Sequence, residues 1–335
     1  MKILITLWCV ILFGISCAPA LAGETKMQID QHEQYPYIVD VSFGRKGRIE
    51  DGGSAIVVHP RILLMAAHEF FDEKGRKISL KEIRVVHNGT HTYRAEVDRV
   101  YMHPEIEAYL RKGTGDQDIP FRKASDDLAV VVLTSSIDGV PLAHTMLEKE
   151  SLDYLASVDS TLGNKAPPPD DLKGFATKEW QAVIEKVMLD PAKPVTIRTV
   201  GFGVICMSGG KRCDDRKRRI RAAMLRRWKS CDTSRHLAPT KVWCVRGFIA
   251  PGDSGGAVIA DMPSGTHTVI GIIAISRPPF SGRKLVWSDA SAASVFDAND
   301  LLKKARAREA VLPPKTAQEL KEEPPPKKVR KRNNR

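Results

Sequence analysis

Residues 251–257 read Pro-Gly-Asp-Ser-Gly-Gly-Ala, and this stretch indicates the fold and the function more strongly than any other part of the chain. Glycines on both sides of Ser254 let the backbone turn tightly and bring N–H groups toward a developing oxyanion, while the hydroxyl stays exposed to a substrate. A serine alone is a poor nucleophile and needs a base, which in turn needs an orienting acid. The motif therefore predicts two further catalytic residues elsewhere in the sequence.

Two upstream stretches supply candidates for the base and the acid. Residues 62–68 (ILLMAAH) form an apolar run that ends in His68, and residues 127–133 (DLAVVVL) place Asp127 at the start of another apolar run. Singly, such a histidine is usually structural and such an aspartate often caps a turn. The chain order His68, Asp127, Ser254 is one of the known orders of a Ser-His-Asp triad, so the three motifs together predict one catalytic geometry.

With AAH, DLAVVVL and GDSGG in that order, the chain resembles the trypsin-like serine proteases of the chymotrypsin fold. The likeness extends over about residues 35–305 and includes GGS at 52–54, VGFG at 200–203 and GIIAIS at 271–276. The resemblance implies an all-β fold of two six-stranded antiparallel β-barrels with a C-terminal helix. The triad would lie in the cleft between the barrels, with His68 and Asp127 from the first and Ser254 from the second.

Short runs rich in Val, Ile and Tyr, separated by turn residues, predict strands in two groups. The first group is 37–43, 54–59, 82–87, 92–102 and 127–133, and the second is 195–205, 241–246, 256–260, 268–275 and 284–287. Residues 138–194 between the groups exceed the usual linker of the family, and we expect a helical insertion there, with helices near 145–157 and 177–189. Asp297 is expected to cap a final helix through Leu301, Leu302 and Ala305.

The two ends of the chain predict export and a tail. Residues 1–22 combine a lysine, an apolar stretch and an Ala-Leu-Ala cleavage site, which is typical of a secretory signal peptide. Cys17 leaves a lipoprotein signal as the alternative. The apolar stretch is short for a membrane span, and no later segment is apolar enough. We expect a secreted or periplasmic protein with a protease domain at 23–311 and a disordered, basic, Pro-rich tail at 312–335.

The chain is basic, with 52 Lys and Arg against 40 Asp and Glu among 335 residues, a formal net charge of +12. Much of the charge lies at 211–229 and 327–335. Such clusters can bind phosphates, anionic lipids or acidic polysaccharides, or they can form a solvated face, and both interpretations stay open. Nothing in the sequence indicates specific nucleic-acid recognition.

Four cysteines follow the signal peptide: Cys206, Cys213, Cys231 and Cys244. An even number in an exported protein favours disulfides, and four cysteines allow three pairings. The spacing is not C-x-x-C and no histidine cluster accompanies it, so no metal site is expected. The separation of Cys231 and Cys244 is similar to that of a family disulfide that closes a loop ahead of the nucleophile, and the resemblance leaves Cys206 with Cys213.

The sequence departs from the family pattern at three places near the predicted site. No IVGG start is present to provide the amine that pairs with the aspartate before the serine. The partner of Asp253 is therefore the amine at Gly23 or a nearby basic side chain. A family cysteine pair is replaced by Asp51 and Glu69. If the two carboxylates face each other beside His68, one carboxyl pKa is raised or a cation lies between them; the alternative, which we expect, is that both point outward to water. The serine that in the family hydrogen-bonds the triad aspartate falls on Ala274, so one orienting bond is lost.

The sequence thus predicts an exported serine endopeptidase that acts on protein or peptide substrates without a cofactor. Ser254 would attack the peptide carbonyl, His68 would take and return the proton, Asp127 would orient the imidazole, and the N–H groups of Gly252 and Ser254 would form the oxyanion hole. The alternative is a catalytically silent homologue that binds polyanions or protein partners through the basic clusters.

The resemblance also implies where the substrate side chain binds. Phe248, Ala274 and Ser276 would line the primary pocket. Phe248 lies six residues before the nucleophile, where trypsin-like members place an aspartate. A phenyl ring offers no countercharge to Arg or Lys, so we expect cleavage after small or medium apolar residues.

Overall fold

The computed structural model describes most of the predicted protease domain. The described residues are 27–45, 48–50, 52–71, 77–78, 82–87, 91–111, 127–148, 151, 153, 186–188, 190, 195–203, 207–208, 211–212, 217–226, 242–247, 249–250, 252–276, 280–281, 284–285 and 288–320. The predicted signal peptide, residues 321–335 of the predicted tail and most of the predicted insertion lie outside them.

The first half of the chain builds one antiparallel sheet, to which the late strand β19 adds at one edge. Its order is β19-β7-β6-β2-β4-β5-β8. Its strands are β2 (Ile38–Arg45), β4 (Ser54–His59), β5 (Ile62–Met65), β6 (Glu82–His87), β7 (His91–Met102), β8 (Ala129–Leu133) and β19 (Gln318–Leu320), and β3 (Arg48–Glu50) pairs with β2. β7 also pairs with β8. β-branched residues favour pleated strands, and those of β8 are buried on both faces.

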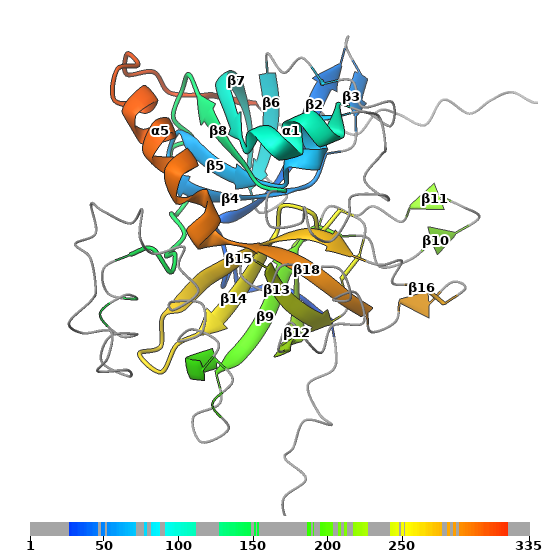
Figure 1. The fold of residues 1–335 in the computed structure, drawn as a ribbon. Helices are drawn as coiled ribbons and strands as arrows, with labels where there is room; N and C mark the ends of the chain where they lie inside the picture. Colours follow the sequence, from blue (N-terminus) through cyan, green and yellow to red (C-terminus); the bar gives the residue numbers. More distant parts are fainter. Residues whose placement is uncertain are drawn as a thin grey trace, which may run out of the picture.

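The second half builds a sheet with the order β1-β12-β13-β18-β15-β14-β9. Its strands are β1 (Gln28–Ile29), β9 (Thr196–Gly201), β12 (Arg219–Arg226), β13 (Val242–Gly247), β14 (Ala257–Asp261), β15 (His267–Ser276) and β18 (Ser288–Ser294). An additional pairing joins β12 to β9, which closes six antiparallel strands into a barrel. Figure 1 shows this barrel below the first sheet. Two small hairpins, β10 (Met207–Ser208) with β11 (Lys211–Arg212) and β16 (Phe280–Ser281) with β17 (Lys284–Leu285), complete the strands described.

Short helices connect and cover the sheets. They are η1 (Ala67–Phe70), α1 (Pro104–Leu110), η7 (Val295–Ala298) and α5 (Asn299–Glu309). α5 buries Leu301, Leu302 and Ala305, the residues predicted for the final helix, and packs against β7 and β8 of the first sheet (Figure 1). Its N-cap is Ala298 rather than Asp297, and no side chain caps it. That part of the prediction is wrong because the helix begins directly after η7.

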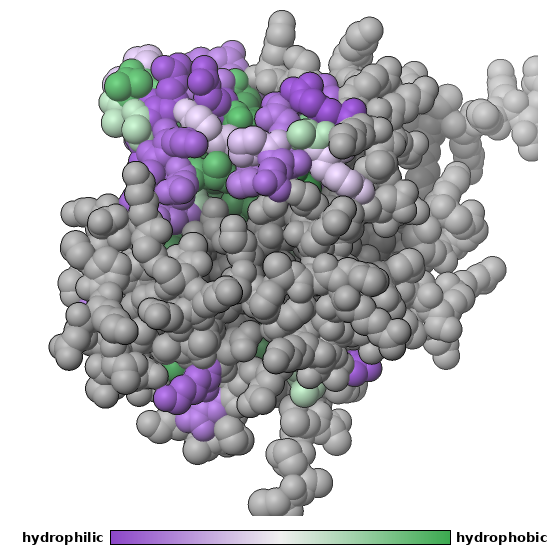
Figure 2. Space-filling model, in the orientation of Figure 1, coloured by the Kyte–Doolittle hydropathy of each residue, from purple (hydrophilic) through white to green (hydrophobic). Residues whose placement is uncertain are grey.

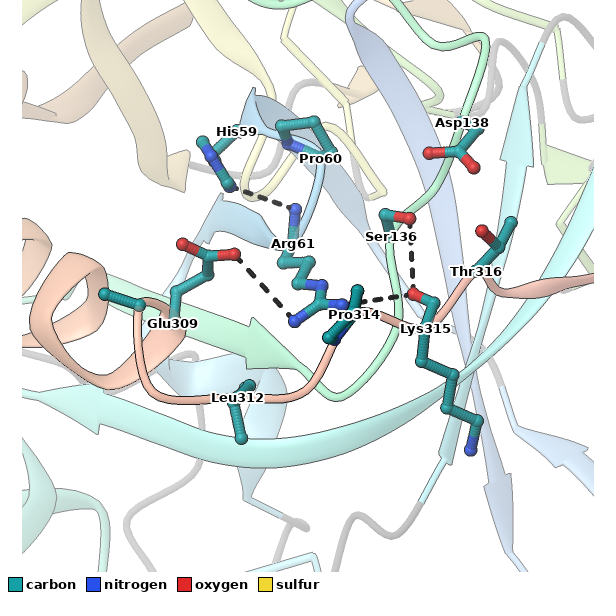
Figure 3. Close-up of a pocket in the computed structure, with 11 residues that line it drawn as sticks. His59, Pro60, Arg61, Ser136, Asp138, Glu309, Leu312, Pro314, Lys315 and Thr316 are labelled. Atoms are coloured by element: carbon teal, nitrogen blue, oxygen red, sulfur yellow. Dashed lines mark hydrogen bonds and ion pairs between the residues drawn. The ribbon is translucent and has the colours of Figure 1, made fainter.

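The chain leaves α5 and returns along the first sheet. Arg61 Nη2 donates to the carbonyl of Pro313 at 2.8 Å, and β19 then pairs with β7. Residues 59–61, 136, 138, 309–310, 312 and 314–316 line a cavity of about 630 Å³ there, which Figure 3 shows beside the Arg61 side chain. It lies at the opposite end of β4 from Ser54 and includes no residue of the predicted triad. In Figure 2, mostly hydrophilic side chains cover the described surface of the first sheet and α5.

The predicted all-β class is confirmed as a mostly β architecture with one closed six-stranded barrel and a second sheet. In the two large sheets, five strands lie outside the ranges predicted from the sequence: β1, β3, β12, β18 and β19. Within the predicted insertion, the structure describes residues 151, 153 and 186–188 as helical, and the remainder of both predicted helices lies outside the described residues or in turns. Among the described residues, the helices are too short or too polar to cross a membrane.

Candidate active site

The predicted base and acid come together because β5 and β8 are antiparallel neighbours. The register pairs Met65 with Ala129, so the residues that follow β5 lie beside those that precede β8. The Nδ1 atom of His68 is 2.7 Å from Oδ2 of Asp127, and the backbone N–H of His68 donates to Oδ1 at 2.9 Å. Asp127 is fully buried. Two hydrogen bonds to one carboxylate therefore fix both the backbone and the ring of the histidine.

The charge around His68 favours its protonated form. Burial by itself lowers the pKa of the imidazole. The Asp127 carboxylate raises this pKa by more than burial lowers it, and Glu69 raises it further. The pKa of His68 is consequently raised well above its ordinary value of 6.5. The ring therefore holds a proton strongly, and it can act as a general base only at a pH at which it has lost that proton.

The predicted nucleophile lies in the turn that leads into β14. Gly252 and Gly255 both have positive φ, at 94° and 78°, a conformation that glycine adopts without a steric penalty. The N–H groups of Asp253 and Gly256 donate within the turn, and that of Gly255 donates to Ile273. Between described residues, the N–H groups of Gly252 and Ser254 donate no hydrogen bond, and Ser254 is half-buried.

Ser54 fastens this turn to the first sheet. Its N–H donates to the carbonyl of Ser254 at 2.8 Å, and its hydroxyl donates to the carbonyl of Gly252 at 2.9 Å. The Ser54 hydroxyl oxygen also accepts a hydrogen bond from the N–H of Phe202 at 3.0 Å. A Cβ on Gly255 would approach within 2.0 Å of the Ser54 carbonyl oxygen and 3.2 Å of the Ala66 nitrogen. The serine turn thus lies against the segment that carries His68. The sequence analysis noted Ser54 in GGS without finding this role.

Asp253 is paired with a basic side chain, the second of the two alternatives. Both oxygens of its fully buried carboxylate accept from Arg221 Nη1, at 2.7 and 2.6 Å. The N–H groups of Gly203 and Ala250 each donate to it at 2.8 Å. A Cβ on Gly203 would meet the carboxylate at about 2.5 Å, which explains the second glycine of VGFG. An internal guanidinium therefore anchors the serine turn.

Three arginines of the basic cluster at 211–229 are internal, so for these three neither a polyanion surface nor a solvated face describes the structure. Arg218, Arg219 and Arg221 are at most 5% exposed. Arg218 donates to Asp30 at 2.7 Å, and Arg219 donates to the carbonyl of Gly203 at 3.1 Å. Since their charged ends bind groups inside the protein, these three side chains are not available to an external anion.

Glu69 also differs from the expectation that it points to water. Its Oε1 atom is 3.4 Å from Nε2 of His68, and its side chain is 17% exposed. The reason is visible at Gly53, where a Cβ would come within 2.8 Å of Oε1. The missing side chain leaves room for the carboxylate to turn inward. Asp51, its expected neighbour, lies outside the described residues.

The other predicted site residues are described only in part. Ala274 is buried at a β-bulge between Ile273 and Ile275, close to the nucleophile turn because Ile273 exchanges hydrogen bonds with it. Phe248 lies outside the described residues, and Ser276 is described only as the last residue of β15. Cys206, Cys213 and Cys231 also lie outside, whereas Cys244 is buried in β13. Both disulfide pairings stay predictions.

No protein-family model matches this sequence, and no curated protein matches it either. The function is therefore inferred from the chain's own residues and their geometry.

Proposed function

We propose that this protein is an exported serine endopeptidase of the trypsin-like, two-barrel type. The observation that carries the proposal is the pair of hydrogen bonds from His68 to the buried Asp127. It is supported by the GDSGG turn, which Ser54 binds to the same sheet. A base, an orienting acid and a serine in a glycine turn are the parts that acyl transfer requires.

In the proposed reaction, Ser254 Oγ attacks the peptide carbonyl carbon while its proton passes to Nε2 of His68. The same proton then goes to the leaving amine as the peptide C–N bond breaks, and water hydrolyses the resulting ester by the reverse sequence. Nδ1–H of His68 donates to Asp127 throughout, which selects the reactive tautomer. The backbone N–H of His68 provides a second bond to this carboxylate, so Asp127 is oriented although Ala274 has no hydroxyl.

The N–H groups of Gly252 and Ser254 are the proposed oxyanion donors. In comparable enzymes one such donor contributes about 3–4 kcal/mol to the transition state. The Arg221–Asp253 ion pair anchors the backbone between them without an amine from a cleaved N-terminus. We therefore propose that the protein needs no tryptic activation step.

The competing function, polyanion binding by a silent homologue, has less support. Polyanion binding would require the cations of residues 211–229 to face an external ligand. Three of these cations are instead buried in internal contacts. The proposed catalytic residues are all present in the chain.

Digestion of a peptide library by the secreted protein tests the proposed activity and its specificity. We expect cleavage after small or medium apolar residues, because Phe248 gives the pocket no countercharge. Ser254→Ala should abolish cleavage. Dominant cleavage after Arg or Lys would contradict the pocket assignment, whereas a folded protein that cleaves no peptide would contradict the endopeptidase itself.

A further inference from the structure

Two carboxylates approach the His68 ring, one on each nitrogen. Asp127 is 2.7 Å from Nδ1, and Glu69 is 3.4 Å from Nε2. Asp127 is the orienting acid of a triad, but a second acid on Nε2 has no part in that scheme. In the proposed reaction Nε2 is the atom that must face the hydroxyl of Ser254.

The Glu69 contact depends on the protonation of the ring. A neutral imidazole that donates from Nδ1 carries a lone pair on Nε2, and an ionised carboxylate is a pure acceptor. The two groups then have no hydrogen to share. An imidazolium carries N–H on both nitrogens and can donate to Asp127 and Glu69 together. Glu69 therefore stabilises only the form of His68 that cannot act as a base.

The structure holds the Glu69 carboxylate close to both catalytic halves. A Cβ on Gly53 would lie 2.8 Å from Glu69 Oε1 and also 2.8 Å from the carbonyl oxygen of Ser254. The acid thus occupies space directly beside the serine turn. Asp127, which precedes β8, and Glu69 in η1 are the charged groups that act on His68 among the described residues.

We propose that Glu69 is a positioning residue that competes with Ser254 for Nε2 of His68 and keeps the site inactive while the ring is protonated. This role rests on the proposed peptidase function. A triad is inactive whenever its base is protonated, and the Glu69 contact extends this inactive state to higher pH. The raised pKa of His68 moves the loss of the proton to higher pH than an ordinary histidine would give.

The test is the rate at which a fluorophosphonate probe labels Ser254, measured across pH for the wild type and three variants. Glu69→Gln removes the charge and keeps the size, so the midpoint of its pH profile should fall by about one pH unit or more. Glu69→Asp keeps the charge on a shorter arm and should retain part of the elevation. Glu96→Gln, at a site that is 62% exposed, should leave the profile unchanged.

The possible results separate this role from the function on which it rests. Labelling with the same midpoint in the wild type and in Glu69→Gln would overturn the role of Glu69 and leave the peptidase intact. Absence of labelling in every variant at every pH would overturn both. If Glu69→Gln does not fold, Glu69→Asp decides, because a midpoint equal to that of the wild type despite its shorter side chain would contradict direct competition for Nε2.

Discussion

The base half and the nucleophile half of the proposed site each depend on a fully buried aspartate, but the two carboxylates have different partners. Asp127 binds His68, an imidazole that can gain or lose a proton. Asp253 binds Arg221, which stays protonated in proteins. The charge of the base therefore changes with pH, whereas the guanidinium that anchors the nucleophile turn keeps its charge over the same range.

Asp127→Asn should produce the largest effect and break the base half alone. An amide in place of the carboxylate favours the wrong imidazole tautomer, which lowers the rate by about 10⁴-fold in a triad of this kind. The rate of probe labelling at Ser254 measures this loss. A fall of less than tenfold would show that Asp127 does not orient His68 for catalysis.

Arg221→Met should break the nucleophile half instead. It leaves the Asp253 carboxylate buried without its countercharge, which costs about 3–5 kcal/mol of unfolding free energy. Urea denaturation measures the loss. Arg308→Met is the matched control, because the Arg308 side chain is 38% exposed in its ion pair with Asp98 and such pairs contribute little to stability. Equal losses in the two variants would contradict the special role of Arg221.

Gly255→Ala tests how closely the two halves pack. The new methyl would lie 2.0 Å from the Ser54 carbonyl oxygen at a φ of 78°, so we expect a loss of about 2–4 kcal/mol from strain and overpacking together. Gly265→Ala has a similar φ of 83° but nothing within 4 Å of its Cβ, and only about 1 kcal/mol should be lost. Denaturation curves compare the two, and a similar loss in both would show that the turn is not held against Ser54.

The pH dependence of stability sharpens the contrast between the partners. Because the folded protein raises the pKa of His68 above 6.5, the stabilisation from this group is complete below that pH and is lost as pH rises through the folded pKa. The quantity to measure is the difference in unfolding free energy between Ser254→Ala and the double variant Ser254→Ala/His68→Gln. This difference should fall by up to about 1.4 kcal/mol per pH unit between pH 6.5 and the folded pKa. A difference independent of pH would contradict the raised pKa.

The sequence made the base half easier to predict than the nucleophile half. His68 and Asp127 lie at the ends of apolar runs, and two neighbouring antiparallel strands suffice to bring them together. Arg221 belongs to a run of basic residues that resembles a solvated face. Its burial depends on Asp253, which is 32 positions away. A weak signal was present, since Arg219 and Arg221 alternate with Ile220 and Ala222 as in a strand.

Glu69 shows a different limit of prediction. The sequence identified an acid beside the histidine, but its direction depends on the space that Gly53 leaves on an adjacent segment of the sheet. For Asp253, the sequence left two possible partners, the amine at Gly23 and a basic side chain. The structure selects the basic side chain, Arg221. Packing between segments that are distant in sequence decided both cases, and no local pattern reports it.

Covalent labelling of the folded wild-type protein by a fluorophosphonate probe, mapped by mass spectrometry, tests the central claim most directly. Only an activated hydroxyl attacks such a phosphorus centre quickly. A catalytic triad predicts one labelled residue, Ser254. Labelling should be abolished in Ser254→Ala and nearly abolished in His68→Ala. Labelling at another serine, or a folded protein that stays unlabelled from mildly acidic to alkaline pH, would contradict the assignment of His68, Asp127 and Ser254 as a catalytic triad.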